Sequence, residues 1–269
     1  MTSGGPLVRY VAENGVGWIT LTRPDVLNAV DTQLARELDA AVERAVRDPE
    51  ARVLVVSGEG RAFSSGMDRT ALSAGETGEP FFRHWIRALN ELEETGKLVI
   101  AAIRGYCIGG GLQLALACDV RLATSDAVLG LGATRHALIP DGAVFRLARV
   151  VGLGRAKELA LLNDNISPET ALGMGLVNWV VPPDEFDPAL RRVIAKCLEA
   201  APTATRHTKR LLQASFHADP RTLIEDVVAS QMECLRSWEM TEANRAWDAK
   251  REARYYPPPD DREGGTSAP

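Results

Sequence analysis

Two glycine-rich segments of the sequence each follow an apolar run that is typical of a buried strand. The first is residues 60–68, Gly-Arg-Ala-Phe-Ser-Ser-Gly-Met-Asp, and the second is residues 104–113, Arg-Gly-Tyr-Cys-Ile-Gly-Gly-Gly-Leu-Gln. Glycine allows tight turns and the close approach of a ligand to the backbone, and a helix that begins there directs free N–H groups at the ligand. Two such loops could each donate one N–H to a single developing oxyanion. The alternative is that both segments are simply tight turns.

A third segment, residues 130–143, contains one carboxylate, Asp141, which precedes Gly142 and a stretch with helical apolar spacing. An aspartate just before a helix can be its N-cap, whereas in a binding loop it can act as a general acid or base. The segment by itself leaves both interpretations open. His136 precedes Asp141 in the same loop. A loop histidine is more often a surface residue than a catalyst, but it could be an acid/base partner of Asp141.

The elements that must position these segments alternate between strand and helix. Two helices are expected: one with apolar residues every four positions from Asp31, its predicted N-cap, to Val46, and one carrying Phe82, Trp85, Ile86, Leu89 and Leu92. Strands are predicted at residues 16–21, 53–56, 98–103, 120–123 and 176–181. The pattern therefore predicts a βαβ-like body with a buried parallel sheet.

Beyond residue 181 the apolar spacing changes and predicts helices only. They are expected at residues 186–200, at residues 203–216, and as one long helix that begins at Asp219-Pro220 and still includes Trp238. A helical end of this size often packs on its own body or on a neighbouring subunit.

Charge and composition exclude several classes of protein. Hydrophobic residues make up 45% of the 269 residues and charged residues 25%, which is ordinary for a globular protein. The chain carries 31 basic and 36 acidic side chains, a net charge of −5. This argues against nucleic acid as the main partner, because binding to its backbone needs a basic face. An anionic small ligand is not excluded, because local cations decide its binding.

The cysteines and the apolar runs suggest where the protein works. Cys107, Cys118, Cys197 and Cys234 are scattered and form no CxxC motif, and no histidine lies at zinc spacing, so we expect free thiols and no metal. The N-terminus has no basic stretch followed by an apolar run, and no apolar run is long enough to cross a membrane. A cytoplasmic protein without a membrane partner is therefore expected.

In their order and spacing, several short motifs resemble the crotonase superfamily, the enoyl-CoA hydratase/isomerase family. Together they cover roughly residues 7–255. No single motif identifies the family, but their combination in this order is specific for it. The matching pieces are residues 21–24 (Leu-Thr-Arg-Pro) with 27–29 (Leu-Asn-Ala), 60–68, 99–111, 117–123 (Ala-Cys-Asp-Val-Arg-Leu-Ala), 151–152 (Val-Gly) and 171–177 (Ala-Leu-Gly-Met-Gly-Leu-Val).

The resemblance implies an α/β fold, a ClpP-like spiral of ββα repeats, which we expect in residues 1–200. It further implies a helical C-terminal region, residues 201–256, that forms homotrimers or dimers of trimers and covers the active site; residues 257–269 would be a flexible tail. The implied partner is an acyl-CoA, in which coenzyme A is part of the substrate and no separate cofactor is needed.

The resemblance also implies the site residues. The family's oxyanion hole falls on the backbone N–H groups of Met67 and Gly110, which would hold the thioester carbonyl and stabilise its enolate or tetrahedral anion. Lys250 and Arg251 match a basic segment that helps to bind the phosphates of coenzyme A, although they could equally form a solvated helix face. The substrate-binding residues implied in this way are Ser65, Gly66, Met67, Asp68, Gly109, Gly110, Gln113, Ala133, Lys250 and Arg251.

The sequence departs from the hydratases of the family at two positions. Hydratases use two glutamates, and here their positions hold Gln113 and Ala133. A neutral amide cannot take a proton from water and alanine has no group for this chemistry. Hydration by the paired-glutamate route is therefore not expected.

Asp141 falls where several members of the family, the dienoyl-CoA isomerases among them, carry a catalytic aspartate. We therefore expect an enzyme in which the oxyanion hole stabilises a thioester enolate and Asp141, with His136 as a candidate partner, moves a proton during double-bond isomerisation. Two alternatives remain open: a hydrolase of an acyl-CoA or a β-dicarbonyl compound, and a catalytically silent homologue that only binds acyl-CoA.

Overall fold

The computed structural model describes residues 5–256, so the expected tail at 257–269 lies outside the described residues. The chain divides into two compact units, of which the first ends at Arg192 and the second begins at Val193. This division falls inside helix α7 (Phe186–Leu198), ahead of the boundary expected at residue 200.

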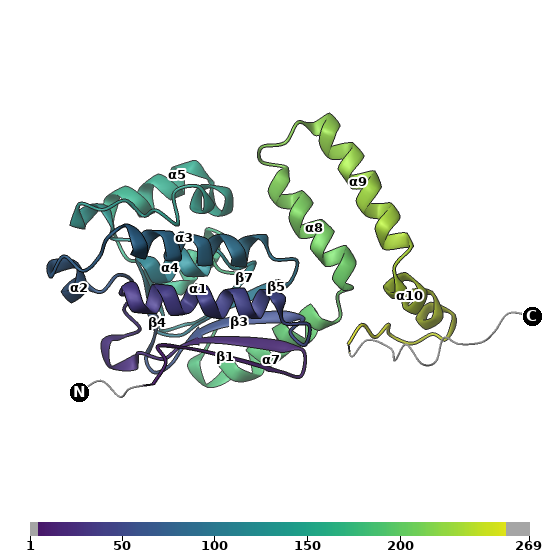
Figure 1. Ribbon diagram of the computed structural model, residues 1–269, viewed down its shortest axis with the longest axis horizontal. Coiled ribbons are helices and arrows are strands. Elements are labelled where there is room, and N and C mark those ends of the chain that lie inside the picture. The colour runs from purple at the N-terminus through teal and green to yellow at the C-terminus, as the bar shows by residue number, and fades with distance from the viewer. Residues whose placement is uncertain (1–4, 257–269) are drawn as a thin grey trace, which may run out of the picture. The chain divides into compact units, whose positions relative to one another are not determined.

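A six-stranded sheet forms the centre of the first unit (Figure 1), in the order β1-β2-β3-β5-β7-β9. Strands β1 and β2 are antiparallel, and every later neighbour pairs in parallel. The apolar runs that predicted buried strands lie in its middle, because a parallel strand is covered on both faces. The strands are β1 (Val8–Glu13), β2 (Val16–Leu21), β3 (Val53–Gly58), β5 (Leu98–Ile103), β7 (Val120–Thr124) and β9 (Trp179–Val181).

A second, three-stranded parallel sheet consists of β4 (Ala62–Ser64), β6 (Tyr106–Ile108) and β8 (Val128–Gly130). Each of its strands follows directly on a strand of the large sheet, so the chain alternates between the two sheets before it enters the next helical segment. This alternation is the ββα repeat that the resemblance implied. It also brings the glycine-rich segments together, since these segments lie on β4, β6 and the residues that follow them.

Helices α1 (Thr32–Arg47) and α3 (Glu79–Glu94) pack against each other and bury their apolar faces in the core. The predicted N-cap is confirmed, because Asp31 Oδ1 accepts the N–H of Leu34 at 2.8 Å. The other helices of this unit are α2 (Arg69–Ser73), α4 (Gly110–Leu116), α5 (Arg146–Leu162), α6 (Pro168–Gly173) and the short 3₁₀ turns η1 (Pro24–Val26), η2 (Thr134–His136) and η3 (Pro183–Glu185). Helix α5 is kinked at Gly152.

The second unit is helical, as predicted, but the long helix expected from Asp219 to Trp238 is wrong. Two helices occur instead, because Ser237 caps a new helix by accepting the N–H of Met240, at 3.3 Å, through its hydroxyl. The helices that follow α7 are α8 (Pro202–Ala214), α9 (Pro220–Leu235) and α10 (Trp238–Asp248).

Most predicted strands are confirmed, and the exceptions have a local cause. Of the strand predicted at residues 176–181 only Trp179–Val181 pairs, because the N–H of Leu176 bonds to the carbonyl of Ala171 and that of Asn178 to the carbonyl of Arg121. Strands β1, β4, β6 and β8 were not predicted; the last three have three residues each, which are too few to show a period. Within residues 5–256, no helix is long and apolar enough to cross a membrane.

Candidate active site

Met67 lies in a loop that is pinned to the start of α1 by a short parallel bridge with Val30. The N–H of Val30 donates to the carbonyl of Gly66 at 2.7 Å, and the N–H of Asp68 donates to the carbonyl of Val30 at 2.9 Å. In a parallel bridge of this kind the flanking residues make the bonds. The N–H of Met67 therefore faces away from Val30 and is free to donate to a ligand.

Gly110 is the first residue of α4, so its N–H has no acceptor within the helix. Gly109, just before it, has φ +55° and ψ −119°, a conformation that favours glycine strongly. Gly66, in the loop that also contains Met67, lies against the start of α4. A Cβ on Gly66 would lie 2.8 Å from the Ile108 carbonyl oxygen and 2.9 Å from the Gly110 nitrogen. Glycine at position 66 is thus required by the contact between the two loops, which places the segments of Met67 and Gly110 side by side.

A cavity of about 200 Å³ lies where these loops meet. Among its lining residues in the described part of the chain, Asp141 is the one carboxylate. The basic side chains among them are those of Arg69 and His136. The remaining wall is mostly apolar and backbone: Val30, Ser65, Met67, Leu72, Phe81, Trp85, Ile108, Gly109, Gly110, Gln113, Leu131, Gly132, Ala133, Leu138 and Ile139. One carboxylate and two outward-facing N–H groups therefore share a small, largely apolar space.

Asp141 lies in the turn before α5 and does not cap that helix, which begins at Arg146 after Phe145. Its Oδ2 is buried and has no hydrogen-bond partner within residues 5–256. Burial raises the pKa of Asp141, and the backbone N–H groups of the turn, the Gln113 side chain and Arg146 act in the opposite direction without cancelling the effect. A carboxyl with a raised pKa in a cavity is a candidate for proton transfer.

The turn that carries Asp141 is held from two sides. On one side, the N–H of Gly142 donates to Gln113 Oε1 at 2.8 Å. On the other, Arg146 donates to the carbonyl of Gly142 at 2.9 Å, and its guanidinium is buried in an ion pair with Glu93 at 2.7 Å. A buried Arg–Glu pair of this type is rigid because either partner alone would be an uncompensated charge. Asp141 is thus held by the backbone contacts of its neighbour Gly142, while its Oδ2 has no hydrogen-bond partner among the described residues.

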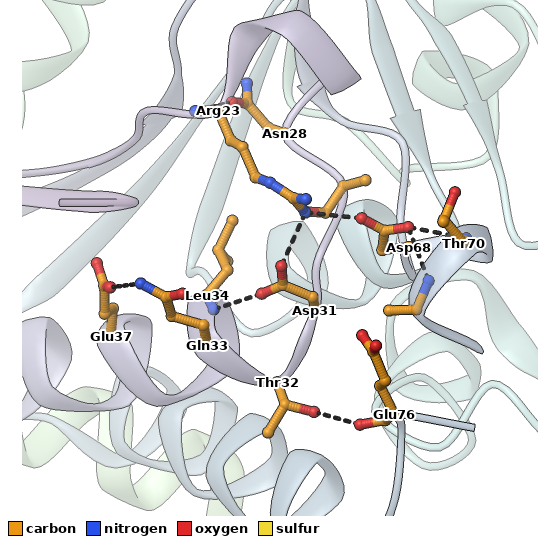
Figure 2. Close-up of polar contacts among 12 residues, drawn as sticks. Arg23, Asn28, Asp31, Thr32, Gln33, Leu34, Glu37, Asp68, Thr70 and Glu76 are labelled. Atoms are coloured by element: carbon orange, nitrogen blue, oxygen red, sulfur yellow. Dashed lines mark hydrogen bonds and ion pairs between the residues drawn. The ribbon is translucent and has the colours of Figure 1, made fainter. Parts of the chain in front are cut away.

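The loop of Met67 is supported from behind by Arg23 (Figure 2). Its Nη1 contacts Asp68 Oδ2 at 2.8 Å and Asp31 Oδ2 at 3.2 Å, and it donates to the carbonyl of Ala29 at 2.8 Å. Asp68 also caps α2 by accepting the N–H groups of Thr70 and Ala71. Burial acts to raise the pKa of Asp68, but these N–H groups and the Arg23 guanidinium hold it below its usual range.

The structure brings most of the expected site residues together. Those that line the cavity are Ser65, Met67, Gly109, Gly110, Gln113, Ala133, His136 and Asp141. Gly66 lies between the loops, and the side chain of Asp68 is turned toward Arg23 and α2. Lys250 and Arg251 belong to the second unit, where Arg251 forms an ion pair with Glu242 at 2.6 Å. Their contact with phosphates stays a prediction.

Three further residues line the cavity, of which Arg69 was not predicted. The position of Arg69 directly after the segment 60–68 does not by itself predict this, because a single charged residue there could equally face solvent. Phe81 and Trp85 form an aromatic wall with ring centroids 6.3 Å apart in a stacked arrangement. Trp85 belongs to the predicted apolar face of this helix, and helical spacing alone does not separate a core face from a cavity wall, because both have the same apolar pattern.

Known proteins are similar to this chain over most of its length. Residues 11–256 match the model of the Enoyl-CoA hydratase/isomerase family. A short-chain-enoyl-CoA hydratase of Clostridium acetobutylicum is 31% identical over 248 residues, 91% of this chain and 95% of that protein. The mitochondrial Delta(3,5)-Delta(2,4)-dienoyl-CoA isomerase of Dictyostelium discoideum is 29% identical over 263 residues, 90% of this chain and 86% of that protein.

Solved structures show the same fold. An enoyl-CoA hydratase from Bacillus anthracis matches with a TM-score of 0.85 and 29% identity over 93% of this chain and 98% of that chain. An enoyl-CoA hydratase subunit from Geobacillus kaustophilus matches with a TM-score of 0.83 and 30% identity over 93% and 97% of the two chains. The fold is that of a crotonase-type protein. The chain belongs to the enoyl-CoA hydratase/isomerase family.

Proposed function

We propose that the protein moves a double bond in an enoyl-CoA by proton transfer, with Asp141 as the acid/base. The observation that carries this proposal is that Asp141 is the one carboxylate among the described residues lining a cavity that the Met67 and Gly110 loops also form. One carboxylate can take a proton from one carbon and return it to another, whereas the addition of water by the paired route uses two.

The reaction balances with these groups alone. The ionised Asp141 takes a proton from the carbon α or γ to the thioester, and the electron pair of that C–H bond passes into the conjugated system. The negative charge collects on the thioester oxygen, where the N–H groups of Met67 and Gly110 stabilise the enolate. Protonated Asp141 then returns the proton to the other carbon, so the double bond has moved and the enzyme is unchanged.

The surroundings of Asp141 suit this task. Burial raises the pKa of its carboxyl, so the protonated form that the intermediate step needs is less costly than in water. The apolar wall of Phe81, Trp85 and Leu131 excludes water from the enolate, which supports isomerisation over side reactions.

Hydration is the second candidate, because the clostridial relative is named a hydratase. Against it, Gln113 and Ala133 line the cavity at the positions where the resemblance implies glutamates. The dienoyl-CoA isomerase of Dictyostelium discoideum supports the isomerase interpretation by its name.

One experiment separates these functions. The protein is incubated in D₂O with 3-enoyl-CoA and dienoyl-CoA thioesters, and in parallel with crotonyl-CoA, and the products are followed by NMR and mass spectrometry. We expect a shifted double bond, with deuterium at the α or γ carbon to the extent that the proton on Asp141 exchanges with solvent before it is returned. Both changes should be lost in D141N. Rapid hydration of crotonyl-CoA would overturn the proposal. Binding of acyl-CoA without exchange or turnover across the panel would indicate a silent homologue, and release of free coenzyme A a hydrolase.

We further propose that the second unit mediates assembly into a homotrimer or a dimer of trimers. Large apolar side chains are exposed along α8, α9 and the turn between them, as a face that packs on another copy requires: Leu212, Phe216, Ile224, Val227 and Val228. Sedimentation equilibrium of the full chain tests this; a monomer at micromolar concentration would contradict it.

A further inference from the structure

The carboxamide of Gln113 is fixed between two groups that can only donate. Its Oε1 accepts the N–H of Gly142 at 2.8 Å and the indole N–H of Trp85 at 3.3 Å. Because neither partner has a lone pair to offer, the oxygen of the amide must face them and its NH₂ group must face the other way. Gln113 is 5% exposed, so the amide has little room to turn toward water.

Asp141 lies beside this amide. Both side chains line the same cavity, and Asp141 Oδ2 is buried without a partner in the described part of the chain. Burial raises the pKa of Asp141, and the Gln113 side chain is among the groups that act against that rise, as a donor close to the carboxylate would. The NH₂ group is therefore the part of Gln113 that remains available to the carboxylate.

The contact between the turn and the amide leaves no room for a larger residue. A Cβ on Gly142 would lie 2.6 Å from Gln113 Oε1 and 2.4 Å from Leu89 Cδ1. Glycine at position 142 therefore allows the backbone to contact the Gln113 amide directly. A shift of Gln113 would move Gly142 and, with it, the adjacent Asp141.

We propose that Gln113 is the positioning residue for Asp141: it anchors the Asp141–Gly142 turn through its carbonyl oxygen and orients the carboxylate through its NH₂ group. The inference rests on the proposed proton transfer by Asp141 and deepens it. It assigns Gln113 no proton of the reaction. It also explains how Asp141 keeps a fixed orientation without a second carboxylate, since a neutral amide supplies both an acceptor for the turn and a donor for the carboxylate.

Two substitutions separate the two halves of this role. Q113E preserves the size and both accepted bonds, but it loses the donor and adds a negative charge beside Asp141, and like charges resist joint ionisation. Q113M preserves the volume but accepts and donates nothing, so the N–H groups of Gly142 and Trp85 lose their acceptor. Q33E makes the same chemical change as Q113E at an exposed position of α1 that does not line the cavity, and is the matched control.

The other charged groups near Asp141 must stay constant in the comparison. They are Arg146 with its partner Glu93 behind the turn, and Arg69 and His136 at the cavity wall. None of them is changed in the variants, and all variants are compared over one pH range at one ionic strength.

The test is an NMR titration of the full chain labelled with ¹³C at the Asp and Glu carboxyl groups, with the Asp141 signal assigned from its loss in D141N. In Q113E we expect the first proton at the site to bind at a pH about one unit higher than in the wild type, and no change in Q33E. In Q113M we expect the kcat of deuterium exchange to fall about tenfold or more, with little change in KM.

The outcomes distinguish this inference from the proposed function. An unchanged titration in Q113E, or wild-type kcat in Q113M, would overturn the role of Gln113 even if D141N is inactive. A wild-type protein that introduces no deuterium into any acyl-CoA and shifts no double bond would overturn the proposed function. The titration would still test the contact between Gln113 and Asp141. If Q113M does not fold, Q113E, which retains both accepted bonds, carries the test alone.

Discussion

Arg23 and Asp68 form an ion pair, 2.8 Å between Nη1 and Oδ2, that ties the segment before α1 to the loop holding Met67 (Figure 2). Their side chains are 21% and 12% exposed, so water compensates little for a lost partner. The pair thus links stability to the placement of an N–H group that the proposed reaction uses.

We predict that R23M lowers the free energy of unfolding by about 1–3 kcal/mol, because Asp68 stays largely buried without its cation. Urea unfolding at neutral pH measures this. The control is R9M, which removes the Arg9–Glu59 pair, whose side chains are 52% and 38% exposed. An exposed pair contributes about 0–1 kcal/mol, so equal losses in both variants would contradict the prediction.

The stabilisation by Asp68 also depends on pH. Its pKa is lowered in the folded protein, so the folded state binds this proton less tightly than the unfolded state does. The contribution is present above the unfolded pKa, about 3.9, and is lost as the pH falls through the lowered folded value. We expect the stability difference between the wild type and D68N to shrink below about pH 4. A difference that does not change from pH 7 to pH 3 would rule this out.

Gly66 should not tolerate a side chain. G66A places a Cβ 2.8 Å from the Ile108 carbonyl oxygen at a φ of +89°, so the Gly109–Gly110 loop must move. We expect loss of activity by about a hundredfold, as for misplaced oxyanion donors. The control is G75A, which has a similar φ of +72° but nothing within 4 Å of the added carbon. It should cost about 1 kcal/mol of stability and leave the rate unchanged. Full activity in G66A would show that the loops do not form the site.

The sequence predicted the local elements well and the site in part. Asp31 was predicted as the N-cap of α1 from its residue type and position, and the apolar run at 98–103 matches β5. The segments of Gly66 and Gly110 stood out because close backbone contacts require glycine, but the resemblance to the family was needed to assign them to a site. The partner of Asp68 was not found, because Arg23 lies 45 residues away in sequence and only the fold brings them together. Likewise, no local pattern shows that Gln113 meets Gly142, since that contact depends on how α4 faces the turn.

Lys250 allows a test of the predicted phosphate contact. If it binds a phosphate of coenzyme A, K250M should raise the KM for an acyl-CoA several-fold and leave the KM for the matching acyl-pantetheine thioester unchanged, since the shorter thioester lacks the nucleotide phosphates. K196M removes the same charge from an exposed position of α7 and should affect neither. An equal rise for both substrates in K250M would contradict the contact.

The last prediction concerns the cost of burying Asp141. Burial raises its pKa, so the folded state binds this proton more tightly than the unfolded state does. The stabilisation linked to the protonated form is complete below the unfolded pKa of about 3.9 and is lost as the pH rises through the raised folded value. Relative to D141N, which does not titrate, the wild type should therefore lose stability as the pH rises across this window.

Urea unfolding of both proteins from pH 3 to pH 8 measures the difference, and its pH dependence is free of any constant cost of the new amide. D126N, which changes an exposed aspartate in the turn between β7 and β8, is the control and should show no such trend. In the same window, the exchange rate of the wild type should rise with pH as Asp141 becomes an ionised base. A stability difference that is flat from pH 3 to pH 8 would show that the carboxyl is not buried at the cost described.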